Sequence, residues 1–353
     1  MASLVTGIGY MGAALVEALL ARNERVIGLD NGFSTDRAVL ACLVAAGLEL
    51  VDGDVAEPVD VATAFARGPI DTVYHFAAQA SAHPDAADAA YTERTNLQGP
   101  RVVLDAMLCH GARTIVYASS FKVYGEALRG AIDEARPYGV FRDMSHLSKV
   151  HAEKLLEMYA GLHGLRCLSL RFGIVHGLGP IFKTDPRFMT APNKFCWQIA
   201  RGEPISVFGG GRAPAGWLHL ADAVNATLAA AHPGFGGYRS LNVVGEVASV
   251  AQVAALAREV AASRGLTAQI DGIDPAALLD ESARFTVRSG LDRIPEARPR
   301  HTLRDSLPHV LDHCIALAAR ATQTGASHGD HLSVSGNREG HPARLTTHDS
   351  RPA

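Results

Sequence analysis

The stretch Thr6-Gly7-Ile8-Gly9-Tyr10-Met11-Gly12 decides the fold. A short apolar run precedes it within residues 1–6, and apolar residues at helical spacing follow it over 11–19. A second apolar run, Val26-Ile27-Gly28-Leu29, then stops at Asp30. The order of strand, glycine turn, helix, strand and acid is the dinucleotide-binding fingerprint in its required context.

Each part of this fingerprint has a physical task. The first glycine allows a tight turn, the second lets backbone N–H groups approach a pyrophosphate, and the third brings helix and strand together. The N-terminus of the helix presents partial positive charge to the phosphates. Asp30 can accept hydrogen bonds from the adenosine ribose, and its charge repels a 2′-phosphate, so we expect NAD rather than NADP.

Composition limits the remaining possibilities. The 353 residues include 33 basic and 36 acidic ones, a balance that favours neither a nucleic-acid partner nor a membrane surface. No apolar run is long enough to span a bilayer, and the cofactor strand begins almost at Met1, so we expect no secretion signal. Five scattered cysteines without a CxxC pair indicate reduced thiols and a cytoplasmic location; Cys42, Cys109 and Cys167 are predicted to lie in the core.

Helical and strand patterns alternate through the first half of the chain, which predicts an α/β fold with a doubly wound parallel sheet. The expected helices lie near 36–46, 58–67, 85–109 and 145–163, and the expected strands near 48–51, 72–76, 114–118 and 167–171. The helix at 145–163 is predicted to bury its large apolar residues, which are Leu147, Val150, Leu155, Met158 and Leu162.

Glycine and proline interrupt this alternation from about residue 173. We therefore predict a Rossmann domain over 1–172 and a smaller substrate lobe over 173–319, with part of 217–245 returning to the Rossmann domain. Helical patterns occur over 249–263, 275–281 and 301–320. The segment 320–353 lacks an apolar period and is predicted to be a disordered tail, and its irregularly spaced histidines predict no metal site.

The chain resembles the extended short-chain dehydrogenases/reductases of the NAD-dependent epimerase/dehydratase group, which act mainly on nucleotide sugars. The resemblance extends to about residue 310. It rests on these landmarks: residues 6–12, Asp30, Asp54-Val55, His75-Phe76-Ala77-Ala78-Gln79, Thr95-Asn96, Ser119-Ser120, Val123-Tyr124-Gly125, Ser148-Lys149, Arg171-Phe172-Gly173 and Trp217-Leu218-His219-Leu220-Ala221-Asp222. The glycine loop is one residue shorter than is usual in that family.

The resemblance implies a set of residues around NAD and a homodimer formed through the helices near 85–109 and 145–163. The implied cofactor residues are Gly7, Gly9, Tyr10, Met11, Gly12, Asp30, Asn31, Asp54, Val55, Phe76, Ala77, Ala78, Gln79, Asn96, Lys149 and Phe172.

The resemblance also implies transient hydride transfer with a Ser/Thr, Tyr and Lys set, of which only part is present. Ser120 and Lys149 occupy the Ser/Thr and lysine positions, but the tyrosine position, four residues before the lysine, holds Ser145. A serine hydroxyl is a far poorer base than a tuned phenol. Tyr138 is eleven residues from Lys149, so its participation would require an unusual loop.

Other groups are candidates for the proton chemistry. Lys122 lies two residues after Ser120, where the resemblance implies an acidic catalytic residue, and a desolvated lysine there could act as acid or base. His146 and His176 are further candidates for the base. Lys149 has two interpretations, a cofactor contact or a surface lysine paired with Glu153.

The substrate side departs from the family pattern. Ile174 stands where the family uses an asparagine for the nucleotide diphosphate, and Ala215 where it uses an arginine. His176, Lys194 and Arg212 are therefore the predicted substrate contacts.

Three functions are compatible with these sequence features. The first is NAD-dependent modification of a nucleotide sugar. The second is an oxidoreductase or epimerase acting on another polar substrate, such as a cyclitol, a sugar phosphate or a natural-product intermediate. The third is a catalytically silent NAD-binding protein.

Overall fold

The computed structural model describes residues 2–81, 88–126, 128–231, 235–274 and 285–326. Its centre is a seven-stranded parallel sheet in the order β11-β7-β5-β4-β1-β2-β3. Its strands are β1 (Ala2–Thr6), β2 (Arg25–Asp30), β3 (Glu49–Asp52), β4 (Ile70–His75), β5 (Thr114–Ser120), β7 (Arg166–Phe172) and β11 (Tyr238–Val243). The strand order reverses between β1 and β4, which is where such sheets bind ligands at their carboxyl edge.

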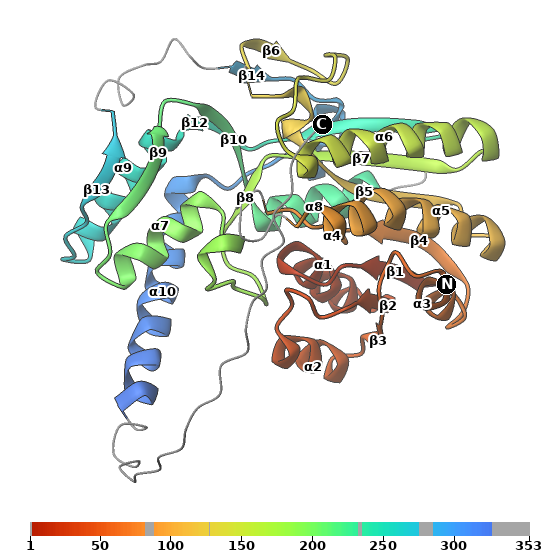
Figure 1. The fold of residues 1–353 in the computed structure, drawn as a ribbon, viewed down its shortest axis with the longest axis horizontal. Helices are drawn as coiled ribbons and strands as arrows, with labels where there is room; N and C mark the ends of the chain where they lie inside the picture. The colour runs from red at the N-terminus through yellow and green to blue at the C-terminus, as the bar shows by residue number, and fades with distance from the viewer. Residues whose placement is uncertain (1, 82–87, 127, 232–234, 275–284, 327–353) are drawn as a thin grey trace, which may run out of the picture.

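Helices cover both faces of the sheet, so the predicted doubly wound fold is confirmed (Figure 1). One core cluster joins a face to α1 (Tyr10–Ala21), α2 (Arg37–Ala45) and α8 (Leu220–Ala230). The other cluster joins the opposite face to α3 (Pro58–Phe65), α5 (Gly99–His110) and α6 (Met144–His163). Apolar side chains on both faces explain why the strands read as nearly continuous hydrophobic runs.

The helix predicted over 85–109 is interrupted. Its described part consists of α4 (Ala89–Thr92), a π-helical turn over Glu93–Gln98 and α5. The π turn contains Asn96, whose side chain bonds to the backbone of Gln79. Such turns are frequent at functional sites.

The buried face of α6 is only in part the predicted one. Val150 and Leu155 are partly buried and pack against core clusters. Leu147, Met158 and Leu162 are 47%, 48% and 69% exposed, so their expected burial was wrong. Small and polar residues face the sheet instead, among them Ser145, Ser148, Lys149, Ala152 and Glu153. Apolar periodicity was therefore wrong for three of the five residues, because buried polar side chains such as Lys149 and Glu153 occupy part of the inner side of the helix.

A smaller lobe follows β7 and lies to the left of the sheet in Figure 1. It contains a three-stranded sheet in the order β12-β10-β8 and a two-stranded pair, β13-β9. Another pair, β14-β6, joins this part of the chain to the segment before α6. These strands are β6 (Gly130–Ile132), β8 (Ile174–His176), β9 (Ile205–Gly210), β10 (Pro214–His219), β12 (Glu246–Ser249), β13 (Ile270–Ile273) and β14 (Phe285–Val287).

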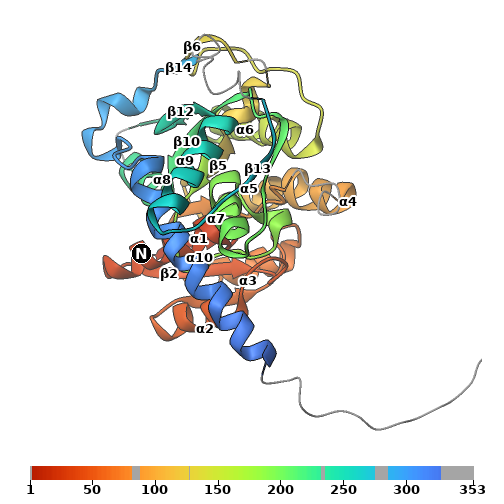
Figure 2. The same ribbon diagram turned by 90° about the vertical axis from the view of Figure 1, so that its left-hand side faces the viewer.

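Three helices form the core of this lobe around Trp217, which is fully buried. They are α7 (Ala191–Ala200), α9 (Val250–Ser263) and α10 (Leu303–Ala326), and Figure 2 shows them gathered on one side of the molecule. The last helix runs to Ala326, so the predicted tail boundary at residue 320 was too early. The helix predicted over 275–281 and the tail after 326 lie outside the described residues.

Two of the cysteine expectations also need correction. Cys167 is buried, as predicted, but Cys42 and Cys109 are exposed. Cys42 lies on α2, whose buried residues are Leu40 and Leu43, and Cys109 lies on α5, whose buried side includes Val103, Leu104 and Met107. Both thiols lie on the exposed side of their helix.

Candidate active site

The glycine loop after β1 is packed too closely for side chains at two of its three glycines. Gly7 has a φ of +78°, and a Cβ there would lie 2.4 Å from the backbone of Ala77. A Cβ on Gly12 would lie 2.0 Å from the Gly7 carbonyl oxygen. The loop, the start of α1 and the end of β4 are therefore held together by direct backbone contact.

Gly9 differs because a Cβ on it would meet nothing within 4 Å. Gly9 is the N-cap residue of α1 and no side chain caps that helix. The N–H groups at the start of α1, on Tyr10, Met11 and Gly12, thus face an open cradle with the positive end of the helix dipole behind it. This arrangement fits the pyrophosphate of a dinucleotide.

A substitution at Gly9 separates cofactor binding from folding. Because Gly9 has a φ of −78° and open space beside it, Gly9→Ala should leave the melting temperature unchanged. It should nevertheless lower NAD affinity about tenfold or more, since a methyl group enters the cradle. Calorimetric titration and a thermal melt measure the two effects. Gly12→Ala is the contrasting variant, because the added methyl group should lower the melting temperature. Unchanged NAD binding in Gly9→Ala would show that the pyrophosphate does not bind at the N-terminus of α1.

Asp30 holds the shortened loop. Its two carboxylate oxygens accept hydrogen bonds from Ile8 N (2.6 Å) and Gly32 N (2.8 Å), and it is only 8% exposed. Lys183 of the following lobe reaches the same region, where its Nζ lies 3.3 Å from Ser34 Oγ.

Asn31 and Asp54 meet next to this site. Asn31 Nδ2 donates to Asp54 Oδ2 at 3.3 Å, and Arg94 forms an ion pair with the same carboxylate at 2.5 Å. Val55 is buried against Gly99. The segment after β3 is therefore bound to the π-helical turn through the ion pair between Asp54 and Arg94.

Asn96 connects the end of β4 to α6. Its side chain accepts from Gln79 N and donates to Gln79 O, both at 2.8 Å, and also donates to Ser148 Oγ at 3.0 Å. Phe76 and Phe172 pack with ring centroids 6.2 Å apart at the ends of β4 and β7. Ala78 lies between Phe76 and Gln79 in the chain. The predicted cofactor residues at the carboxyl ends of β4 and β7 are therefore neighbours in the structure.

Lys149 is buried, and the surface interpretation of this residue is wrong. Its Nζ donates to Ala118 O at 2.7 Å and lies 4.8 Å from the centre of the Tyr117 ring. Burial lowers the pKa of Lys149 to about 8, although Glu153 opposes the shift. The ammonium group thus lies beside β5, on the carbonyl two residues before Ser120 in the chain.

The tyrosine position is occupied by Ser145, which is only 8% exposed. The next residue, His146, pairs through Nδ1 with Asp143 Oδ2, and its backbone N donates to Asp143 Oδ1 at 2.9 Å. Lys122 is exposed, and its backbone N donates to Ser120 Oγ at 3.2 Å. The expected desolvation of Lys122 is therefore wrong for this structure.

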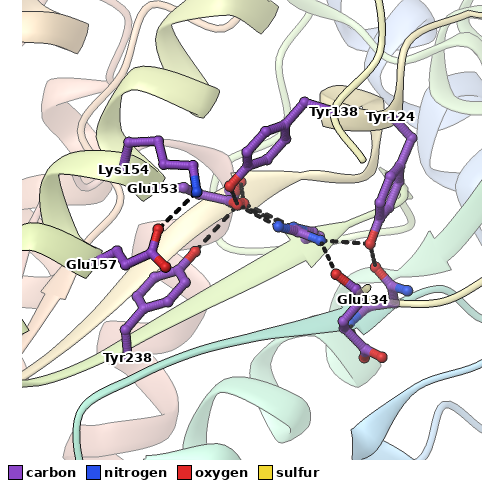
Figure 3. A network of polar contacts seen from close by, with 10 residues as sticks. Tyr124, Glu134, Tyr138, Glu153, Lys154, Glu157 and Tyr238 are labelled. Atoms are coloured by element: carbon purple, nitrogen blue, oxygen red, sulfur yellow. Dashed lines mark hydrogen bonds and ion pairs between the residues drawn. The ribbon is translucent and has the colours of Figure 1, made fainter. Parts of the chain in front are cut away.

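A polar network lies one helical turn beyond Lys149 (Figure 3). Its centre is Glu153, which is fully buried and pairs with Arg171 at 2.6 Å. Glu153 also accepts from Ser119 Oγ (2.5 Å), Tyr138 Oη (3.0 Å) and Tyr238 Oη (3.2 Å). Burial and Glu153 together raise the pKa of Tyr138, whose hydroxyl donates to Glu153, so this phenol is unsuited to act as a base.

The predicted substrate contacts do not converge. His176 is 1% exposed and hydrogen-bonds through Nδ1 to Ser306 of α10 at 3.0 Å, so it lies in the interior rather than at a substrate surface. Arg212 forms an ion pair with Asp274. Lys194 is half-buried, with its Nζ 5.8 Å from the ring centre of Phe208, which is 82% exposed.

Two buried histidines predict acid sensitivity. Burial lowers the pKa of His75 and of His176 from 6.5 to about 3, so both are neutral in the folded protein. Unfolding restores their ordinary pKa, so the folded state loses stability as the pH falls below 6.5. At pH 5 the loss should be about 2 kcal/mol for each histidine. Urea titrations at pH 7 and pH 5 measure the loss in free energy of unfolding. The variant His176→Gln should lose about half as much stability between these pH values as the wild type. Equal stability of the wild type at both pH values would contradict the prediction.

Sequence reasoning missed several residues of the site. Asp143 could have been found as an N-cap residue three positions before His146. Tyr10 Oη donates to Gly177 O at 2.7 Å, and Asn193 bonds to both backbone groups of Gly177, which links α1 to the smaller lobe. Nothing local in the sequence signals these long-range contacts.

The fold is that of an α/β protein, and the open N-terminus of α1 fits the pyrophosphate of a dinucleotide. Residues 3–243 match the family model described as the NAD dependent epimerase/dehydratase family. The chain belongs to this family, which confirms the resemblance. It is therefore an enzyme of the epimerase/dehydratase type, and NAD is its cofactor.

Curated relatives and solved structures agree with this family. The chain is 30% identical to the chloroplastic UDP-sulfoquinovose synthase of Spinacia oleracea, over 86% of this chain and 73% of the relative. It is 28% identical to UDP-glucose 4-epimerase of Halalkalibacterium halodurans, over 64% of this chain and 69% of the relative. The UDP-glucose 4-epimerase of Thermus thermophilus, solved in complex with NAD, superposes with a TM-score of 0.73 at 26% identity, covering 89% of this chain and 99% of that one.

Neither a metal centre nor a membrane span is found in the described part of the chain. No group of three or more His, Cys, Asp and Glu side chains there is arranged to hold a metal ion. No helix within those residues is both long and apolar enough to cross a bilayer.

Proposed function

We propose that this enzyme modifies a nucleotide sugar through transient oxidation of a sugar hydroxyl, with its proton chemistry moved away from the usual tyrosine position. NAD, when bound, takes up the hydride from the sugar carbon. The observation that carries the proposal is Lys149, which is buried beside β5 with its Nζ donating to Ala118 O at 2.7 Å, two residues before Ser120 in that strand. A silent binding protein would have no physical need to bury this ammonium group.

The chain's own residues divide the work. The open N-terminus of α1 holds the cofactor pyrophosphate, and Lys149 holds the nicotinamide ribose. Ser120 orients the sugar hydroxyl. Lys122 and His146 are the two candidates for the proton transfer. Lys122 follows Ser120, to which its backbone N donates, and His146 lies in the first turn of α6.

For the nucleotide part of the substrate, UDP is the choice that the relatives support. The curated relatives named above act on UDP-sugars by name. Within this chain, the exposed Phe208 ring beside Lys194 offers an aromatic face next to a positive charge. An aromatic face can stack a base, and an ammonium group can pair with phosphate oxygens.

One observation favours a second candidate, an epimerase or oxidoreductase of a polar substrate without a nucleotide. Ile174 and Ala215 replace the two residues expected to hold a diphosphate, and Arg212 is already paired with Asp274. Thermal shifts with UDP, dTDP, GDP and CDP in the presence of NAD separate the candidates. Stabilisation by one nucleoside diphosphate supports the nucleotide sugar, whereas no shift with any of them supports the second candidate.

The proposal includes a homodimer in which a second copy covers the outer face of α6. Leu147, Met158 and Leu162 leave an exposed apolar stripe on this helix, and such stripes mark association surfaces. The double substitution Met158→Glu/Leu162→Glu should convert the dimer to a monomer in sedimentation velocity, because it would bury four carboxylates across a two-fold interface. Val59→Glu, on the exposed side of α3, is the matched control and should stay dimeric. A wild type that sediments as a monomer would refute the dimer.

A further inference from the structure

We infer that His146, oriented by Asp143, is the group that exchanges the substrate proton in place of the missing tyrosine. The inference rests on the proposed function, because it concerns the same reacting hydroxyl. Asp143 is a positioning residue, and His146 is the catalytic residue.

The geometry of the first turn of α6 fixes the histidine ring. Asp143 is the N-cap residue of the helix, and one of its oxygens accepts from the backbone N of His146 at 2.9 Å. Its other oxygen pairs with His146 Nδ1. A carboxylate accepts only, so Nδ1 carries the proton and Nε2 keeps its lone pair. The imidazole therefore presents a basic nitrogen in a fixed direction, as in other Asp–His pairs.

The charges around the ring favour its neutral form. Burial and Lys122 lower the pKa of His146, while Asp143 and Glu126 partly oppose the shift. Lys122 acts from the 3₁₀ turn after β5, against which α6 packs. A histidine that is neutral at neutral pH can accept a proton, and the nearby carboxylate stabilises the imidazolium that results.

The position of the ring suits this role. His146 directly follows the residue at the tyrosine position, and its side chain is 18% exposed, so a substrate can reach it. Lys122, whose charge acts on the ring, lies two residues after Ser120. The 3₁₀ turn that begins directly after Ser120 packs against α6, so His146 belongs to the helix that borders this end of β5.

The other groups near this point are less suitable. The Tyr138 and Tyr124 hydroxyls donate to Glu153 and Asn242, and burial raises the pKa of both phenols. Lys122 is exposed and therefore lacks the desolvation that a lysine base requires.

The proton step follows from these contacts. As the sugar alcohol becomes a carbonyl, the hydroxyl proton passes to His146 Nε2, while bound NAD⁺ would supply the acceptor for the hydride that leaves the carbon. The imidazolium then returns the same proton to the oxygen when the carbonyl is reduced, so the histidine ends neutral.

The pairing can be tested without any substrate. In ¹⁵N NMR spectra of the labelled full-length protein, His146 should show the Nδ1–H tautomer and titrate below 6.5. Lys122→Met should raise its pKa. Asp143→Asn keeps a good N-cap residue, so the melting temperature should hold, but the Nδ1–H tautomer should no longer dominate. An Nε2–H tautomer in the wild type would overturn the inference.

Turnover supplies the second test, with UDP-glucose, UDP-galactose and UDP-glucuronic acid as probes. His146→Gly should bind NAD as the wild type does, turn over about 10²–10⁴ times more slowly, and recover with added imidazole. Wild-type turnover in His146→Gly would overturn the inference but leave the proposed function standing. Thermal shifts that show no nucleoside diphosphate binding would instead defeat the proposed function, while the tautomer measurement would still decide the Asp143–His146 pair.

Discussion

Lys149→Met is expected to stabilise the protein while removing its function. Burial lowers the pKa of Lys149 from 10.5 to about 8, so the ammonium group is held in the folded state at a cost of roughly 3 kcal/mol at neutral pH. Methionine has a similar shape and no charge, so it removes this cost and loses only the hydrogen bond to Ala118 O. The free energy of unfolding should therefore rise by about 1–2 kcal/mol.

The same substitution should weaken NAD binding at least tenfold and lower turnover by about 10²–10⁴, because Lys149 holds the nicotinamide ribose. Urea titration and calorimetry measure the two effects separately. Lys154→Met is the matched control, since Lys154 lies on the same helix and its side chain is 59% exposed. A variant that is less stable but binds NAD normally would show that Lys149 is a structural residue.

Glu153→Ala is expected to have the largest effect on stability. The carboxylate is fully buried and is the partner of Arg171, Ser119, Tyr138 and Tyr238 (Figure 3). Removing it leaves the Arg171 guanidinium buried without its carboxylate partner, which costs about 3–5 kcal/mol. Urea titration should show a loss of this size.

The double variant Glu153→Ala/Arg171→Met tests whether the unpaired Arg171 guanidinium causes this loss of stability. Because it removes both charges, it should recover a large part of the lost stability relative to Glu153→Ala. A loss below about 1 kcal/mol in Glu153→Ala, or a double variant less stable than either single one, would contradict the role of the pair.

The cofactor half of the molecule could be predicted because its signals are local. Gly7, Gly12 and Asp30 lie within one strand-helix-strand unit, where Gly12 packs on the Gly7 carbonyl and Asp30 accepts from Ile8 N. The contact between Gly7 and Ala77 joins distant segments and was not predicted. The parallel sheet follows from the alternation of patterns in the same way.

The catalytic half could not be predicted because its contacts join distant segments. Periodicity assigns Leu147 and Met158 to the core of α6, whereas the interior side of that helix holds Lys149 and Glu153 in a polar network. The sequence suggests that Glu153 pairs with Lys149, but the Glu153 carboxylate pairs with Arg171 of β7 instead. Only the Asp143–His146 pair has a local signature, the N-cap spacing of three residues.

Whether the proton chemistry has moved away from residue 145 can be measured by comparing the wild type with Ser145→Tyr. Both proteins are incubated with NAD and UDP-glucose, UDP-galactose or UDP-glucuronic acid, and product formation is followed by NMR. We expect the wild type to convert at least one of these sugars and Ser145→Tyr to do so no faster, because a phenol at this buried position would crowd the site. An inert wild type with an active Ser145→Tyr variant would show instead that the enzyme has lost its base rather than replaced it.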